Sequence, residues 1–157
     1  MANTLKVCCV LLTLAIGFGC GAHHPFRHTD CPDPATVTVL CEKTKITVTD
    51  DDQEPADEAV CVNTDQTITW KLDNASPDGT KLTIHEFKKK KRIGWDKDRK
   101  PMPASSYDAD KQNPASAKVK VIDEEGKPLK GLFKYSVTCT FQDGSDKKKD
   151  PMIEVPK

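Results

Sequence analysis

The chain has 157 residues, 24 basic and 24 acidic side chains, and a formal net charge of zero. Basic and acidic runs are interspersed, which argues against nucleic-acid binding through a broad basic surface. Roughly 135 residues remain once an N-terminal export signal is removed, enough for one domain with its own hydrophobic core.

Residues 1–19 have the pattern of a secretory signal peptide. Lys6 supplies a positive charge, and the uncharged apolar stretch from Val7 to Phe18 follows it. This stretch matches the middle region of a signal and is shorter than the ~20 apolar residues that span a bilayer. We therefore expect an extracytoplasmic protein that lacks the signal when mature.

The signal ends in Gly19-Cys20, which resembles the lipobox of bacterial lipoproteins. The resemblance implies that Cys20 is lipidated and becomes the N-terminus, anchoring the protein to a membrane of the cell envelope. The alternative is ordinary cleavage near Gly19 or Ala22, which would leave a periplasmic or secreted protein.

Residues 20–34 are predicted to be a tether without periodicity, and they contain His23 and His24. Cleavage after Gly21 would place His24 third from a free amine, an arrangement that chelates copper or nickel. Lipidation of Cys20 removes that amine, and the two histidines then belong to a polar linker.

Four cysteines lie beyond Cys20, at positions 31, 41, 61 and 139. An even number in an oxidising compartment predicts two disulfides, and the spacing lacks the close pairs of a structural zinc site. Three connectivities are open. Strand alternation places Cys41 and Cys139 on core faces, which favours that pair and leaves Cys31 with Cys61.

Residues 35–157 are predicted to be one β-sandwich domain. Apolar and polar residues alternate with period two, and β-branched and aromatic residues are enriched, which is typical of strands. The pattern predicts an all-β, Greek-key sandwich. The expected strands are residues 36–41, 45–49, 60–62, 67–72, 82–87, 119–122, 133–141 and 152–155.

A long polar excursion is expected at residues 88–117, beginning with the basic run Lys88–Arg92. Basic side chains near an anionic surface contribute about 1 kcal/mol each, so this run could contact anionic lipid or polysaccharide. The alternative is a solvated loop, because Asp96 and Asp98 follow closely.

Two segments resemble the cupredoxin family of plastocyanin and azurin type. Val60–Leu72 is similar to its strand–turn–strand motif, and Gly131–Cys139 with Asp150–Val155 is similar to its C-terminal hairpin. The resemblance implies a cupredoxin-like sandwich. An immunoglobulin-like sandwich is the competing architecture, because both are Greek-key β-sandwiches.

The resemblance also implies a copper site of two histidines, a cysteine and an axial ligand such as methionine. His85 lies near the position of the first histidine, but no histidine follows it, and Val137 stands where the ligand cysteine is usual. Cys139 lies two residues beyond that position. We therefore predict that the copper site is missing and that no cofactor is bound.

These observations predict a non-enzymatic binding or structural domain of the cell envelope, whose partner is an unknown envelope protein or polymer. With His85 as its one histidine, the predicted domain offers no nucleophile–histidine–acid set. The alternative is a copper-binding or electron-transfer protein that uses His85, His23 or His24.

Overall fold

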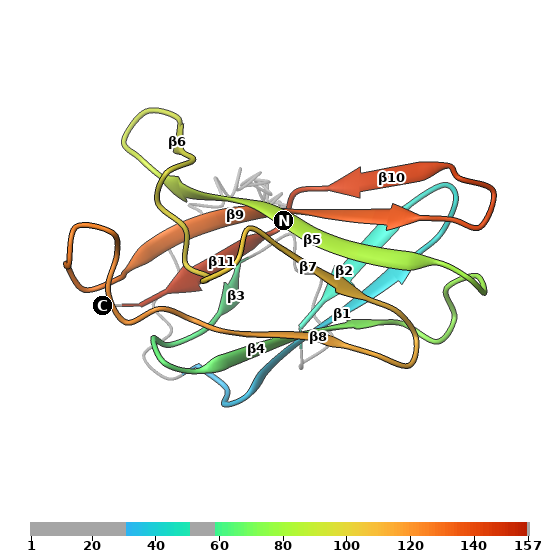
Figure 1. The fold of residues 1–157 in the computed structure, drawn as a ribbon, viewed down its shortest axis with the longest axis horizontal. Coiled ribbons are helices and arrows are strands. Elements are labelled where there is room, and N and C mark those ends of the chain that lie inside the picture. Colours follow the sequence, from blue (N-terminus) through green and yellow to red (C-terminus); the bar gives the residue numbers. More distant parts are fainter. Residues whose placement is uncertain (1–30, 51–58, 157) are drawn as a thin grey trace, which may run out of the picture.

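The computed structural model describes residues 31–50 and 59–156, and all of their regular secondary structure is β-strand. The strands form two facing sheets (Figure 1). The prediction of an all-β sandwich is confirmed. Residues 1–30, which include the predicted signal, Cys20, His23 and His24, lie outside the described residues.

The smaller sheet has four strands in the order β2-β1-β4-β8. Their inward residues are apolar and their outward residues are mostly threonine, serine and lysine, so alternation explains why one face is buried. In this sheet β1 and β4 run parallel, and the other neighbours are antiparallel. Its strands are β1 (Ala35–Cys41), β2 (Ile46–Thr49), β4 (Thr67–Leu72) and β8 (Ala115–Lys118).

The larger sheet has seven strands built around the long antiparallel pair β5–β9. Its main order is β3-β11-β9-β5-β6, while β10 pairs with the second half of β9 and β7 with the first half of β5. Its strands are β3 (Val60–Cys61), β5 (Lys81–Lys90), β6 (Trp95–Asp96), β7 (Ser106–Ala109), β9 (Gly131–Thr140), β10 (Asp146–Lys149) and β11 (Met152–Val155).

Aromatic rings fill the centre of the core between the sheets. Trp70 of β4 packs against Phe87 of β5, Tyr107 of β7 and Tyr135 of β9, with ring centroids 5.8 to 6.3 Å apart. Trp70, Phe87 and Tyr135 are almost fully buried. Few large rings therefore supply much of the contact that holds the two layers together.

The segment 88–117 contributes more regular structure than its composition indicates. β5 extends through Lys90, and the segment also contains β6, β7 and β8, with Met102 fully buried. The prediction of a strand at residues 119–122 is wrong. β8 ends at Lys118, and beyond it Val121 and Ile122 are half exposed.

A β-bulge interrupts β5 at Glu86. His85 lies opposite Ser136, but the next pair is Lys88 with Lys134, so β5 contains one extra residue. Glu86 has a φ of 54°, in the left-handed region that non-glycine residues seldom adopt. The extra residue changes which side of the sheet each later residue faces.

The described part of the chain contains no helix long and apolar enough to cross a membrane.

Candidate functional site

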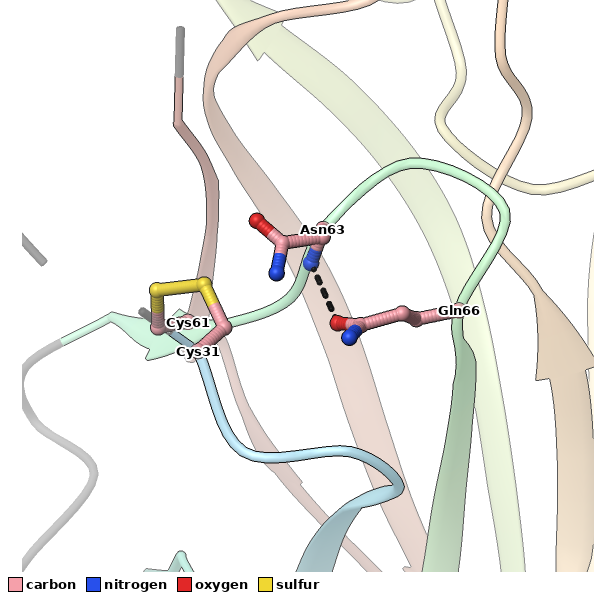
Figure 2. Close-up of a disulfide and its surroundings, with 4 residues drawn as sticks. All are labelled: Cys31, Cys61, Asn63 and Gln66. Atoms are coloured by element: carbon pink, nitrogen blue, oxygen red, sulfur yellow. Dashed lines mark hydrogen bonds between the residues drawn. A yellow bond between two sulfur atoms is a disulfide. The ribbon is translucent and has the colours of Figure 1, made fainter. Parts of the chain in front are cut away.

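Two disulfides are present among the described residues, as the cysteine count predicts. Cys31 is bonded to Cys61, and Cys41 to Cys139, which are the pairs that strand alternation favours. Figure 2 shows the Cys31–Cys61 bond at the edge of the larger sheet. In the turn beside it, the backbone N–H of Asn63 donates to the side-chain oxygen of Gln66 at 2.9 Å. Paired cysteines fit an extracytoplasmic location.

The Cys41–Cys139 bond joins the two sheets. Cys41 ends β1 in the smaller sheet, Cys139 lies in β9 of the larger sheet, and neither side chain is exposed. The bond occupies the Cys139 sulfur, which is therefore unable to serve as a thiolate ligand for a metal.

His85 lies on the outer face of the larger sheet. Its Nε2 atom is 2.8 Å from the Thr138 hydroxyl, and its Nδ1 atom is 4.0 Å from the Glu86 carboxylate. A hydroxyl, an imidazole and a carboxylate thus stand in the sequence of a nucleophilic triad. The 4.0 Å gap is too long for a hydrogen bond, however, so Glu86 does not orient the imidazole.

Glu86 instead belongs to a group that we call the bulge cluster: Glu86, Ser136, Lys148 and Asp150. Lys148 donates to Glu86 at 2.9 Å, and the buried Ser136 hydroxyl is 2.7 Å from Asp150 and 3.1 Å from Glu86. A hydroxyl has one proton, so Ser136 donates to one carboxylate at a time. The cluster connects the bulge to β9, to β10 and to the turn before β11.

The contacts in this cluster stabilise the ionised carboxylate of Glu86. Hydrogen bonds from Lys148 and Ser136 lower the pKa of Glu86 from 4.5 to about 2. The same hydrogen bond also acts on Lys148, because its contact with Glu86 raises the pKa of the lysine. A carboxylate held ionised in this way binds its neighbours and does not accept a proton near neutral pH, which suits a structural role.

The second charged feature is residues 88–100, which we call the basic hairpin. It comprises the end of β5, the turn, β6 and the residues that follow, and it projects from one end of the sandwich (Figure 1). Eight of its residues are basic and two are acidic. A third of the chain's basic side chains are therefore gathered in this short segment.

Trp95 lies directly after the turn of the basic hairpin, where it pairs with Lys90. The Lys90 ammonium lies 4.9 Å from the centre of its ring, and the Lys134 ammonium lies 5.3 Å from it. Cation–π contacts of this kind hold the lysine stems against the ring and leave their charges near solvent. At the turn, Ile93 is 89% exposed.

A shallow hollow of about 580 Å³ lies on one side of the hairpin. Its four basic and four acidic residues balance one another, and Asp96 within it is paired with Lys91 at 2.9 Å. Such a balanced lining does not select a small anion. The excess positive charge lies outside the hollow, on the residues of the turn and its flanks.

No group of three or more histidine, cysteine, aspartate or glutamate residues within residues 31–50 and 59–156 is arranged to hold a metal ion. Sequence reasoning did not identify the bulge cluster, because its members come from three separate segments. One signal was available: the inward residues Ile84 and Phe87 are three positions apart, which strict alternation does not allow.

Compared with models of known protein families and with curated protein sequences, the chain matches none.

Proposed function

We propose that this chain is an exported, lipid-anchored, non-enzymatic binding or structural domain of the cell envelope. The observation that carries the proposal is the pair of disulfides, which use all four cysteines of the described residues. Disulfides persist in oxidising compartments, and this agrees with the signal pattern of residues 1–19. The lipobox-like Cys20 supplies the anchor.

The geometry supports a binding or structural role over an enzymatic one. His85 bonds to Thr138 on an open sheet face, and its nearest carboxylate is committed to Lys148 and Ser136. The hollows lie elsewhere, beside the basic hairpin and along other parts of the surface. A catalytic base ordinarily faces a concave site that can hold substrate.

The alternative, a copper-binding or electron-transfer protein of cupredoxin type, has less support. Its thiolate would have to come from Cys139, which is bonded to Cys41. The resemblance to that family then concerns the architecture of the sandwich, and the metal chemistry is not carried over.

The proposal is tested by expressing the full chain with its own leader in a bacterial host and isolating the mature protein. We expect a membrane-bound product whose mass corresponds to a lipidated N-terminal Cys20, with no free thiols after denaturation. Cys20→Ser is the matched control and should give no lipidated form. A mature N-terminus beyond Cys20 would refute the anchor, and four free thiols would refute the oxidised state.

Addition of copper(II) to the purified protein separates the two candidate functions. We expect no intense thiolate-to-copper absorption in the visible range, because no free thiolate is present beside His85. Such a band, at one copper per chain, would favour the electron-transfer alternative.

A further inference from the structure

We infer that the basic hairpin is a contact site for an anionic phospholipid surface. This inference rests on the proposed function, because it names the ligand of the envelope-binding domain. It starts from a charge asymmetry: the chain as a whole is neutral, yet residues 88–100 contain eight basic and two acidic side chains. Each basic side chain near an anionic bilayer contributes about 1 kcal/mol.

The acidic groups near the hairpin are largely matched by bases. Asp96 pairs with Lys91, and Glu125 accepts hydrogen bonds from Arg99 and Lys127. Arg92 and Lys97, in contrast, are exposed and have no ion-pair partner among the described residues. Positive charge is thus left over in the turn of the hairpin and directly after β6.

Exposed apolar side chains at the same end of the sandwich favour a lipid bilayer over an anionic polysaccharide as the ligand. Ile93 is 89% exposed directly after Arg92, and Val121 and Ile122 are 53% and 52% exposed in the loop that leads to β9. These three are the exposed large hydrophobic residues of the described chain. A bilayer offers an apolar phase to such side chains, whereas a polysaccharide does not.

Trp95 adds an interfacial anchor. Its ring is half-buried and lies close to the ammonium groups of Lys90 and Lys134, so an aromatic surface and two positive charges occur together. Tryptophan favours the headgroup level of a bilayer because its ring is amphipathic. The hairpin thus presents basic side chains for the anionic headgroups, an aromatic ring for the headgroup level and an exposed isoleucine for the apolar phase beneath it.

The point where the chain enters the domain lies at the same end of the sandwich. Cys31 is bonded to Cys61, and Cys61 of β3 pairs with Glu154 of β11. Glu154 in turn pairs with Leu132, at the end of β9 that lies next to the basic hairpin. Residues 20 to 31 reach at most about 40 Å when extended. A lipid at Cys20 would therefore hold this end close to the membrane, where a second contact strengthens the first.

The test uses the oxidised chain from Gly21 onward, which contains every described residue and carries no lipid. Vesicles of phosphatidylcholine alone are compared with vesicles of phosphatidylcholine mixed with phosphatidylglycerol, by flotation and by tryptophan fluorescence. We expect binding to the mixed vesicles, loss of binding at high salt because charges are screened, and a blue shift of emission. Trp95→Phe should abolish the shift, since Trp70 is already fully buried.

Variants locate the contact. Arg92→Glu with Lys97→Glu should weaken binding by at least about thirty-fold, because two basic contacts are lost and two carboxylates are repelled by the anionic surface. Lys45→Glu with Lys147→Glu makes the same charge change on exposed residues of the β1–β2 turn and β10, at the opposite end (Figure 1), and should bind like the parent chain. Ile93→Ser should weaken binding roughly tenfold without changing the charge.

Three results would overturn the inference: equal binding to neutral and mixed vesicles, equal loss in the two charge-reversal pairs, or binding to a soluble anionic polysaccharide with none to vesicles. Each of these leaves the proposed function standing, because lipidation and disulfide state are measured on the full chain. Conversely, a missing lipid at Cys20 does not affect the vesicle result.

Discussion

At the scale of single residues, Glu86 combines an unfavourable backbone conformation with favourable polar contacts of its side chain. Its backbone has a φ of 54°, and its carboxylate contacts Lys148, Ser136 and Lys88. Left-handed backbone costs a non-glycine residue roughly 1–2 kcal/mol. The polar contacts of the carboxylate partly offset that cost and hold the bulge in place.

Glu86→Gln should change how stability depends on pH. The pKa of Glu86 is lowered from 4.5 in the unfolded chain to about 2, so its contribution is present above pH 4.5 and is lost as the pH falls toward 2. Because its side chain is 42% exposed, we expect the contribution to be below about 1 kcal/mol. Urea unfolding at several pH values measures it.

The variant should therefore lose less stability than the parent across this pH range. Asp146→Asn is the matched control: it removes an exposed carboxylate of β10 outside the bulge cluster. Parallel curves for the parent and Glu86→Gln would show that Glu86 does not stabilise the fold through its charge.

Residue-level prediction succeeded where alternation decides the outcome. Cys41 and Cys139 were placed on core faces by strand parity, and both are fully buried. It did not identify the surroundings of His85, because Thr138 and Glu86 reach it through cross-strand pairing and the bulge. Contacts of that kind depend on register, which a single sequence does not specify on a polar face.

At the scale of secondary-structure elements, the bulge sets the orientation of the end of β5. Leu82 and Ile84 face the core before it, and Phe87 faces the core after it. Lys88 then pairs with Lys134 on the outer face, and Lys90 reaches Trp95. Because the bulge takes up Glu86, the residues after it keep the facing of a regular strand, and the basic hairpin presents Trp95 and its lysines on the outer face.

Deletion of Glu86 should leave Phe87 in the aromatic core. Without the extra residue, Phe87 is two positions after Ile84 and lies opposite Tyr135, so regular alternation directs it inward without a bulge. The deletion should therefore cost far less than Phe87→Ala, which removes a buried ring and should destabilise the domain by about 3–5 kcal/mol. Urea unfolding compares the two; equal losses would show that the facing of Phe87 depends on the bulge itself.

Elements with mixed apolar and polar faces were predicted well, and polar edge strands were not. The expected strands at 36–41, 67–72 and 133–141 correspond to β1, β4 and β9. β10 has the sequence Asp-Lys-Lys-Lys and is not among the expected strands; it is held by main-chain pairing with β9, which no side-chain pattern reveals. Lysine-rich edges of this kind also discourage pairing with other chains.

At the scale of the whole molecule, Cys41–Cys139 is the covalent link between the layers. It closes a loop of 98 residues that includes β2 to β8 and most of β9. A cross-link of this span removes much of the conformational freedom of the unfolded chain. The two-sheet arrangement was predictable from alternation, whereas the strand order was not, because parallel neighbours such as β1 and β4 are far apart in sequence.

Replacing both Cys41 and Cys139 by serine should lower the free energy of unfolding by about 3–5 kcal/mol. Replacing Cys31 and Cys61, which close a loop of 30 residues at the sheet edge, is the matched control and should cost about 1 kcal/mol less in the same chain-entropy description. Guanidinium unfolding under non-reducing conditions measures both. A larger loss for the Cys31–Cys61 variant would show that local packing, and not loop closure, dominates.

The position of the Cys31–Cys61 bond has a mechanical consequence. A pulling force applied to residues before Cys31 passes through the sulfur atoms to Cys61, and from there to β11 through main-chain pairing. Residues 32–60, including β1 and β2, are bypassed by this shorter path. A domain held by its N-terminal end could thus bear tension at its sheet edge without peeling the strands that close its core.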